Sequence, residues 1–114
     1  MIEREKHREL FMRDPLPRRL GGWAATLRHV SSSARKSVDP KVVYDLNHEA
    51  RRLIEWTAGE TEPEVAAELV RIQILLTVWQ KAWETASQNP HERLLLSLQA
   101  KEWSDRAVDF SGLL

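Results

Sequence analysis

The sequence predicts an all-α protein: an antiparallel up-down four-helix bundle with an additional short N-terminal helix. Apolar residues recur every three or four positions along four long segments, which is the spacing of one face of an α-helix. A residue that can cap a helix lies directly or almost directly before a proline at four places, Asp14, Asp39, Thr61 and Asn89, as expected where helices start. Since only a few residues connect the segments, consecutive helices must turn back on one another.

Residues 2–13 are predicted to form the short N-terminal helix. Few residues in this segment are apolar, so it can bury little surface, and packing of an apolar face supplies most of the stability of a helix in a protein. We therefore divide the chain into an N-terminal helical arm, residues 1–14, and a helical bundle domain, residues 15–112.

The first two helices of the bundle are predicted over residues 16–35 and 40–58. In the first, an apolar row from Leu20 to Ala34 gives one face that can be buried. The second has a comparable row and an opposite face that is polar. Gly59 is expected to cap the C-terminus of this second helix, because glycine readily adopts the left-handed conformation that such a cap needs.

The third bundle helix, residues 62–88, has the best-specified apolar row in the sequence. At its start, Thr61 and Glu64 have the spacing of a capping box. The helix also carries apolar residues outside the main row, among them Ile74 and Val78, so its apolar surface is wider than packing against one neighbour requires. We expect this helix to be either central in the fold or shared between subunits.

The fourth bundle helix is predicted to begin at Pro90. Apolar residues repeat on one face as far as Phe110, and Leu95 and Leu98 widen that face. Gly112 is expected to end the helix.

Composition indicates one folded domain: the 114 residues are 42% hydrophobic and 30% charged. The longest apolar runs are far shorter than a membrane span requires, and the N-terminus lacks the pattern of a secretory signal, so we expect a cytoplasmic protein with no membrane partner. The absence of cysteine excludes disulfides, thiolate metal ligands and cysteine nucleophiles.

Charge is distributed unevenly along a chain whose formal net charge is zero. Residues 1–36 contain nine Lys or Arg against four acids, and the rest of the chain is correspondingly acidic. The two parts can neutralise each other within the fold, which is the interpretation we favour, or mediate a head-to-tail contact between copies, or bind nucleic acid. The candidate phosphate contacts for the last interpretation are Arg8, Arg13, Arg18, Arg19 and Arg28.

No catalytic motif is present: the sequence has no glycine-rich phosphate loop, no Gly-x-Ser-x-Gly and no His-Glu-x-x-His, and no cofactor is expected. A small metal-dependent hydrolase would have to combine Asp45 and His48 with Glu102 and Asp105 from the last helix. Metal sites in helical bundles take such sets from several helices, so we predict no metal site.

Aromatic residues give the candidates for a partner interface. Four of the five tryptophans fall on predicted core rows, but Trp56 shares a polar helical face with Asp45, Glu49 and Arg52, and Tyr44 lies on the adjoining surface. Tryptophan and tyrosine supply much contact area for little loss of conformational freedom. Trp56 is therefore either an interface anchor or a residue packed under the N-terminal arm.

Taken together, these patterns favour a non-enzymatic interaction module. We expect it to form a homodimer through the wide face that carries Ile74 and Val78, and to bind a protein partner through Trp56, Tyr44 and the basic arm. The alternatives are a nucleic-acid-associated regulator that uses the basic N-terminal third and the metal-dependent hydrolase described above.

Overall fold

The structure, a computed structural model, describes residues 2–36 and 39–111. These residues contain no β-strand, and the prediction of an all-α protein is confirmed. Five α-helices and one short 3₁₀ helix follow one another in the order α1 (Ile2–Arg13), α2 (Leu16–Arg35), α3 (Pro40–Thr57), η1 (Ala58–Glu60), α4 (Pro63–Ala86) and α5 (Pro90–Ser111).

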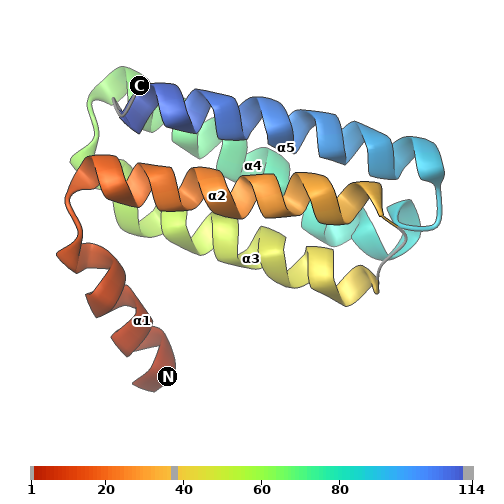
Figure 1. Cartoon of the computed structure of the whole chain (residues 1–114), viewed down its shortest axis with the longest axis horizontal. Helices are drawn as coiled ribbons and strands as arrows, with labels where there is room; N and C mark the ends of the chain where they lie inside the picture. The colour runs from red at the N-terminus through yellow and green to blue at the C-terminus, as the bar shows by residue number, and fades with distance from the viewer. Residues whose placement is uncertain (1, 37–38, 112–114) are drawn as a thin grey trace.

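The four long helices lie side by side, and each runs in the opposite direction to the one before it in the chain (Figure 1). Helix α2 packs against α3 and α5, and α4 packs against the same two helices. Helices α3 and α5 therefore occupy opposite corners of the assembly. Helix α1 lies at a steep angle to the other helices, at the end where α2 begins (Figure 1), and it contacts α3 through His7 and Phe11. No described helix is long and apolar enough to cross a membrane.

Most residues of the predicted core rows are buried, whereas Leu46, Val65, Trp79 and Phe110 are half-buried and pack against the edge of the core. Leu27 of α2, Leu76 of α4 and Leu96 of α5 have no exposed surface at all. In α3 the buried residue of the first turn is Val43, whereas Val42 is exposed. Because side chains three or four residues apart lie on one helical face, each helix buries a single stripe and leaves the opposite face to solvent.

Small residues form the contact between α2 and α5. Ser97 and Ser104 of α5 are buried, and their neighbours in the same row are alanines or serine. The Ser31 hydroxyl donates to the Ser97 carbonyl oxygen at 2.7 Å, and the Ser104 hydroxyl donates to the Ala24 carbonyl oxygen at 2.8 Å. Since interaxial distance depends on the side chains at the contact, this row lets the two helices approach closely.

Two of the predicted helix starts have the expected cap. The Asp39 carboxylate accepts a hydrogen bond from the Lys41 amide at 3.0 Å, and the Asn89 side-chain oxygen accepts one from the His91 amide at 2.9 Å. Each bond satisfies one of the amide groups that have no partner within the first turn of a helix. Helix α2, by contrast, starts after Pro15 without a side-chain cap.

Two predictions at the junction of α3 and α4 are wrong. Gly59 does not cap α3 in a left-handed conformation, because Ala58 stays right-handed and the chain tightens into η1, which contains Gly59. Thr61 does not form a capping box with Glu64, because its hydroxyl donates instead to the Ala58 carbonyl oxygen at 2.8 Å and leaves Glu62 at the N-cap. The predicted end at Gly112 lies outside the described residues.

Candidate functional site

The outward face of α4 is a row of exposed apolar side chains, which we call the α4 row: Val70, Ile74 and Val78. Their exposed fractions are 44%, 60% and 59%. Steps of four residues correspond to about one helical turn, so the three side chains follow one another along the same face. The two interface candidates of α4, Ile74 and Val78, are therefore both accessible.

Contacts of α4 with its neighbours explain why this row points outward. Its buried stripe, which includes Leu69, Leu76 and Trp83, faces the core. On one flank the Trp79 indole donates to the Gln99 side chain of α5 at 2.8 Å, and on the other the Gln73 amide donates to Glu55 of α3 at 3.4 Å. The apolar surface left over after these contacts is exposed, so α4 is not enclosed at the centre of the fold.

Two leucines of α5 adjoin the α4 row. The hydrogen bond between Trp79 and Gln99 fixes the register of the antiparallel pair α4 and α5. Leu95 lies one turn before Gln99 on α5. Since the two helices are antiparallel, Leu95 is level with the turn of α4 that follows Trp79. Leu98 lies on the adjacent outward face of α5. Both leucines are exposed, so they extend the apolar surface from α4 onto α5.

Trp56 is packed under α1 and is not displayed to a partner. Only 8% of it is exposed. The His7 ring meets it edge-on at a centroid distance of 5.2 Å, the Phe11 ring lies at 5.9 Å, and the Arg52 guanidinium lies over it at 5.9 Å. The interpretation of Trp56 as an exposed anchor is therefore wrong, because α1 lays its His7 and Phe11 side against it.

Tyr44 is exposed and lines a groove between α3 and α4 of about 670 Å³. The other residues that line this groove are His48, Arg51, Thr77, Gln80, Lys81 and Glu84. Arg51 donates to the Gln80 side chain across the two helices. No local sequence signal pairs these two residues, which are 29 positions apart, although Tyr44 and Arg51 have the seven-residue spacing of a common helical face.

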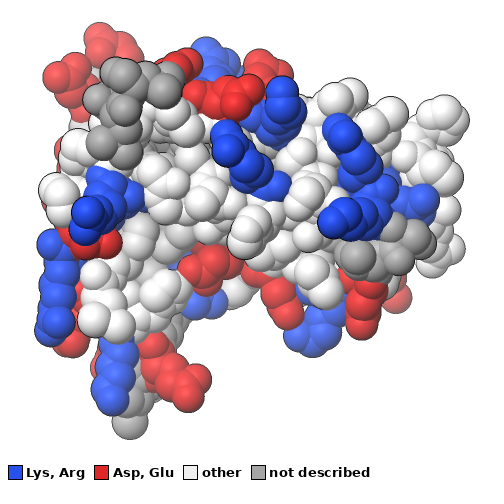
Figure 2. All heavy atoms as spheres, in the orientation of Figure 1, with Lys and Arg blue, Asp and Glu red and all other residues white. Residues whose placement is uncertain are grey.

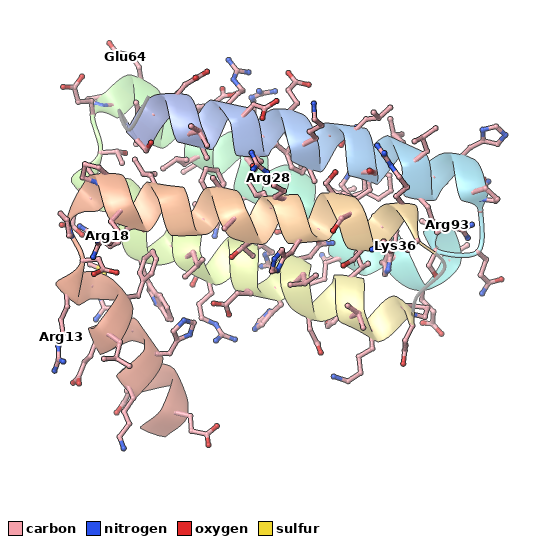
Figure 3. The ribbon with its side chains drawn as sticks, in the orientation of Figure 1. Arg13, Arg18, Arg28, Lys36, Glu64 and Arg93 are labelled. Carbon is pink, nitrogen blue, oxygen red and sulfur yellow. The ribbon has the colours of Figure 1, made fainter. Side chains whose placement is uncertain are left out.

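The basic candidates do not form one patch. Arg13, Arg18 and Arg28 lie well apart along α1 and α2 (Figure 3). On the face of Figure 2 the Lys and Arg side chains form separate groups with Asp and Glu between them. Arg8 is exposed as well. Nucleic-acid binding by these arginines stays a prediction.

Arg19 is a structural residue, so its assignment to a basic surface is wrong. It is only 5% exposed, and its guanidinium donates to the Glu60 carboxylate of η1 at 2.6 and 3.0 Å and to the Asp14 carbonyl oxygen at 3.0 Å. These hydrogen bonds favour the charged carboxylate and lower the pKa of Glu60 from its ordinary value. The pair fastens the start of α2 to η1.

The four residues that the alternative of a metal-dependent hydrolase would require do not come together. Asp45 binds Lys41 at 2.7 Å on α3, and Glu102 and Asp105 are exposed on α5, the helix at the opposite corner. Within the described part of the chain, no group of three or more His, Asp or Glu side chains could hold a metal ion. Glu68 is held by arginines instead: the Arg71 and Arg106 guanidinium groups lie 2.6 and 2.9 Å from it and lower its pKa.

Comparisons with protein-family models, with curated proteins and with solved structures give no significant match to this chain. The functional proposal below therefore rests on the geometry of the α4 row and its surroundings.

Proposed function

We propose that this chain is a non-enzymatic helical interaction module in which the α4 row joins two copies into a homodimer. The observation that carries the proposal is the exposure of Val70, Ile74 and Val78 on one helical face. Removing apolar side chains from water is favourable, and a second copy offers the same row, which can meet the first in an isologous two-fold contact.

A rough balance of free energies indicates how tight such a dimer is. The three side chains of the α4 row with Leu95 and Leu98 make five per copy. Burying a half-exposed aliphatic side chain contributes about 1 kcal/mol, so two copies gain about 10 kcal/mol. Association costs at least about 4 kcal/mol in lost freedom of motion. The difference is at most about 6 kcal/mol, so the dissociation constant is roughly 10–100 µM at the tightest.

The proposal includes the up-down four-helix bundle as the architecture of α2 to α5. It is supported by the alternating directions of these helices (Figure 1) and by the contacts of each with two neighbours. In such a bundle every helix has an inner stripe, two flanks and one outward face. The outward face of α4 is apolar and has no partner within such a bundle, so a second copy would cover it.

A protein partner would meet the exposed side of α1. Trp56 is covered, so the partner surface moves to Leu10, which is 60% exposed, and to Arg13, which is exposed three residues further on the same side of the helix. A large apolar side chain next to an arginine suits a partner with a small apolar pocket and an acidic rim. The cytoplasm stays the predicted location.

Sedimentation velocity tests the homodimer. The wild-type chain should sediment increasingly as a dimer as its concentration is raised from about 10 µM to about 1 mM. Ile74→Glu and Val78→Glu should abolish the dimer, because each places an unpaired charge in the contact. Val42→Glu is the matched control, since Val42 is an exposed valine on α3, and it should leave the dimer intact.

Far-ultraviolet circular dichroism should show the same helix content for all of these variants. A wild-type chain that stays monomeric, or a dimer that survives both α4 substitutions, would contradict the proposal.

A further inference from the structure

The groove between α3 and α4 differs from the other helix contacts because long polar side chains line it. Tyr44, His48 and Arg51 come from α3, and Thr77, Gln80, Lys81 and Glu84 come from α4, around a volume of about 670 Å³. This volume lies within the range of pockets that hold small molecules. It is large enough for a ligand of several non-hydrogen atoms.

Arg51 is fixed in this groove without a carboxylate partner. It donates to the Gln80 side chain, which is itself 93% buried. Its Nε atom is buried and has no hydrogen-bond partner among the described residues, and no described Asp or Glu oxygen lies within 4.0 Å of its guanidinium. A guanidinium presents donors in a planar fork that matches carboxylate and phosphate oxygens. Arg51 is thus held in place and still has donors for an anion.

Other side chains of α4 and α3 add donors around Arg51. Lys81 has no ion-pair partner in the described part of the chain, and both His48 and the Tyr44 hydroxyl can donate to an oxyanion. Glu84 is the one carboxylate among the described residues that line this part of the groove. Arg51 and Lys81 together with Glu84 therefore give the lining one net positive charge, His48 not counted.

The groove continues into an apolar part of about 490 Å³ lined by Pro40, Tyr44 and Trp83, beside the Lys41 to Asp45 ion pair. Tyr44 and Glu84 line both parts, so the two parts adjoin at these side chains. Trp83 is 98% buried, and its indole Nε1 has no hydrogen-bond partner among the described residues. Trp83 therefore meets the groove only at the edge of its ring, and the ring of the exposed Tyr44 supplies most of the aromatic surface of this part.

We propose that this groove binds a small organic anion. Its carboxylate or phosphate group binds Arg51 and Lys81, and the flat apolar group attached to it lies against Tyr44 and Trp83. The site is separate from the α4 row, so this inference does not rest on the homodimer.

Titration with phenyl phosphate, benzoate and inorganic phosphate, followed by nuclear magnetic resonance, tests the site. Phenyl phosphate or benzoate should shift the Arg51 Nε–H, the Gln80 side-chain amide and the Trp83 indole signals. Whichever of the two binds more tightly identifies the oxyanion class. Inorganic phosphate should bind at least about tenfold more weakly than phenyl phosphate, because it makes no contact with the apolar part.

Four variants sharpen the test. Arg51→Gln should weaken phenyl phosphate binding by at least about tenfold, and Lys81→Gln, at an exposed position that cannot disturb folding, should weaken it by a smaller factor. Glu84→Gln should tighten binding, because it removes a like charge. Arg18→Gln is the control and should change nothing. Repeating the titration in the Ile74→Glu chain separates ligand binding from self-association.

Three results would overturn the proposal. If the signals of arginines on α1 and α2 shift as much as those of Arg51, the anion acts by general charge screening and does not bind at this groove. Equal affinity for inorganic phosphate and phenyl phosphate would show that the apolar part of the groove does not contribute to binding. Unchanged binding in both Arg51→Gln and Lys81→Gln would remove its cationic part.

Discussion

The contact between α2 and α5 and the contact between α3 and α4 are built on opposite principles. Small side chains such as Ser97 and Ala100 line the first, and hydroxyl groups donate directly to carbonyl oxygens across it. The second contains the long side chains of Arg51 and Gln80 and leaves a groove beside them. The same fold thus has one closely packed seam and one open seam.

The difference shows how the size of the side chains at a helix contact decides whether that contact is closely packed or leaves space for a ligand. Small residues let two helices approach until little space remains, so this seam can hold only its own atoms. Long polar side chains keep the helix surfaces apart and bring donors to the gap, which suits ligand binding. Substitutions at the two seams should therefore differ in both magnitude and sign.

The largest change in the free energy of unfolding is expected for Ser97→Leu. Ser97 has no exposed surface, and its carbonyl oxygen and hydroxyl both contact Ser31. A leucine overfills the closely packed seam and removes the hydroxyl contact, so the free energy of unfolding should fall by about 3 kcal/mol. Denaturant unfolding monitored by circular dichroism measures this loss.

The matched substitution in the open seam is Thr77→Leu. Thr77 is half-buried and lines the groove, where the larger side chain has space. The free energy of unfolding should change by less than about 0.5 kcal/mol. Equal losses for Ser97→Leu and Thr77→Leu would mean that the two seams are equally tight.

The next largest effect is a gain in the free energy of unfolding, for Asn47→Leu on the buried side of α3. Asn47 of α3 is fully buried, and neither polar atom of its side-chain amide has a hydrogen-bond partner among the described residues. Leucine has a similar shape without the unsatisfied polar atoms, so the free energy of unfolding should rise by about 1–2 kcal/mol. Thermal and denaturant unfolding both measure it, and a loss of stability would show that the amide is satisfied in solution.

Ser31→Ala should have a smaller effect at the closely packed seam. The Ser31 hydroxyl is buried and donates to the Ser97 carbonyl oxygen at 2.7 Å. Losing one such bond without changing the packing should lower the free energy of unfolding by about 1 kcal/mol. Ser32→Ala on the exposed side of α2 is the control, and it should be close to neutral.

The smallest effect is expected from the pair of Arg19 and Glu60, which lies outside both seams and whose carboxylate is half-exposed. The hydrogen bonds from Arg19 lower the pKa of Glu60 below its ordinary value of 4.5. The pair therefore stabilises the fold above pH 4.5, and this contribution is lost as the pH falls through the lower pKa of the folded state.

Melting temperatures measured from pH 6 down to pH 3 test this pair. Glu60→Gln should lower the melting temperature at pH 6, and its difference from wild type should shrink as the pH falls. Glu64→Gln, at an exposed glutamate near the start of α4 (Figure 3), should not show this narrowing. A difference between wild type and Glu60→Gln that stays constant with pH would contradict the role of the ion pair.

Local signals made much of the fold predictable from the sequence. A proline after Asp39 or Asn89 marks a helix start through interactions within a single turn, and the structure shows both caps. The apolar width of the third bundle helix was likewise readable, and Ile74 and Val78 are exposed. Whether that width faced the core or solvent depended on the neighbours of the helix, which no local pattern specifies.

Sequence reasoning failed where a residue depends on a partner far along the chain. Arg19 was assigned to a basic surface because its partner, Glu60, lies 41 residues away. Trp56 is covered by His7 and Phe11 of α1, and the sequence left its cover by the arm as one of two alternatives. The groove could not be predicted, because its lining depends on which residues of α3 lie opposite which residues of α4. Tertiary packing sets this register, and no local sequence pattern specifies it.

The most direct test of the proposed homodimer is an isotope-filtered nuclear Overhauser experiment on a mixture of labelled and unlabelled chains. It detects only contacts between different copies. At concentrations above the expected dissociation constant, the Ile74 and Val78 methyl groups should show contacts to Val70 or Ile74 of another copy, and the methyl groups of Val42 should show none. Intermolecular contacts that involve other surfaces and omit Ile74 and Val78, or no such contacts at all, would contradict the assignment of the α4 row as the dimer interface.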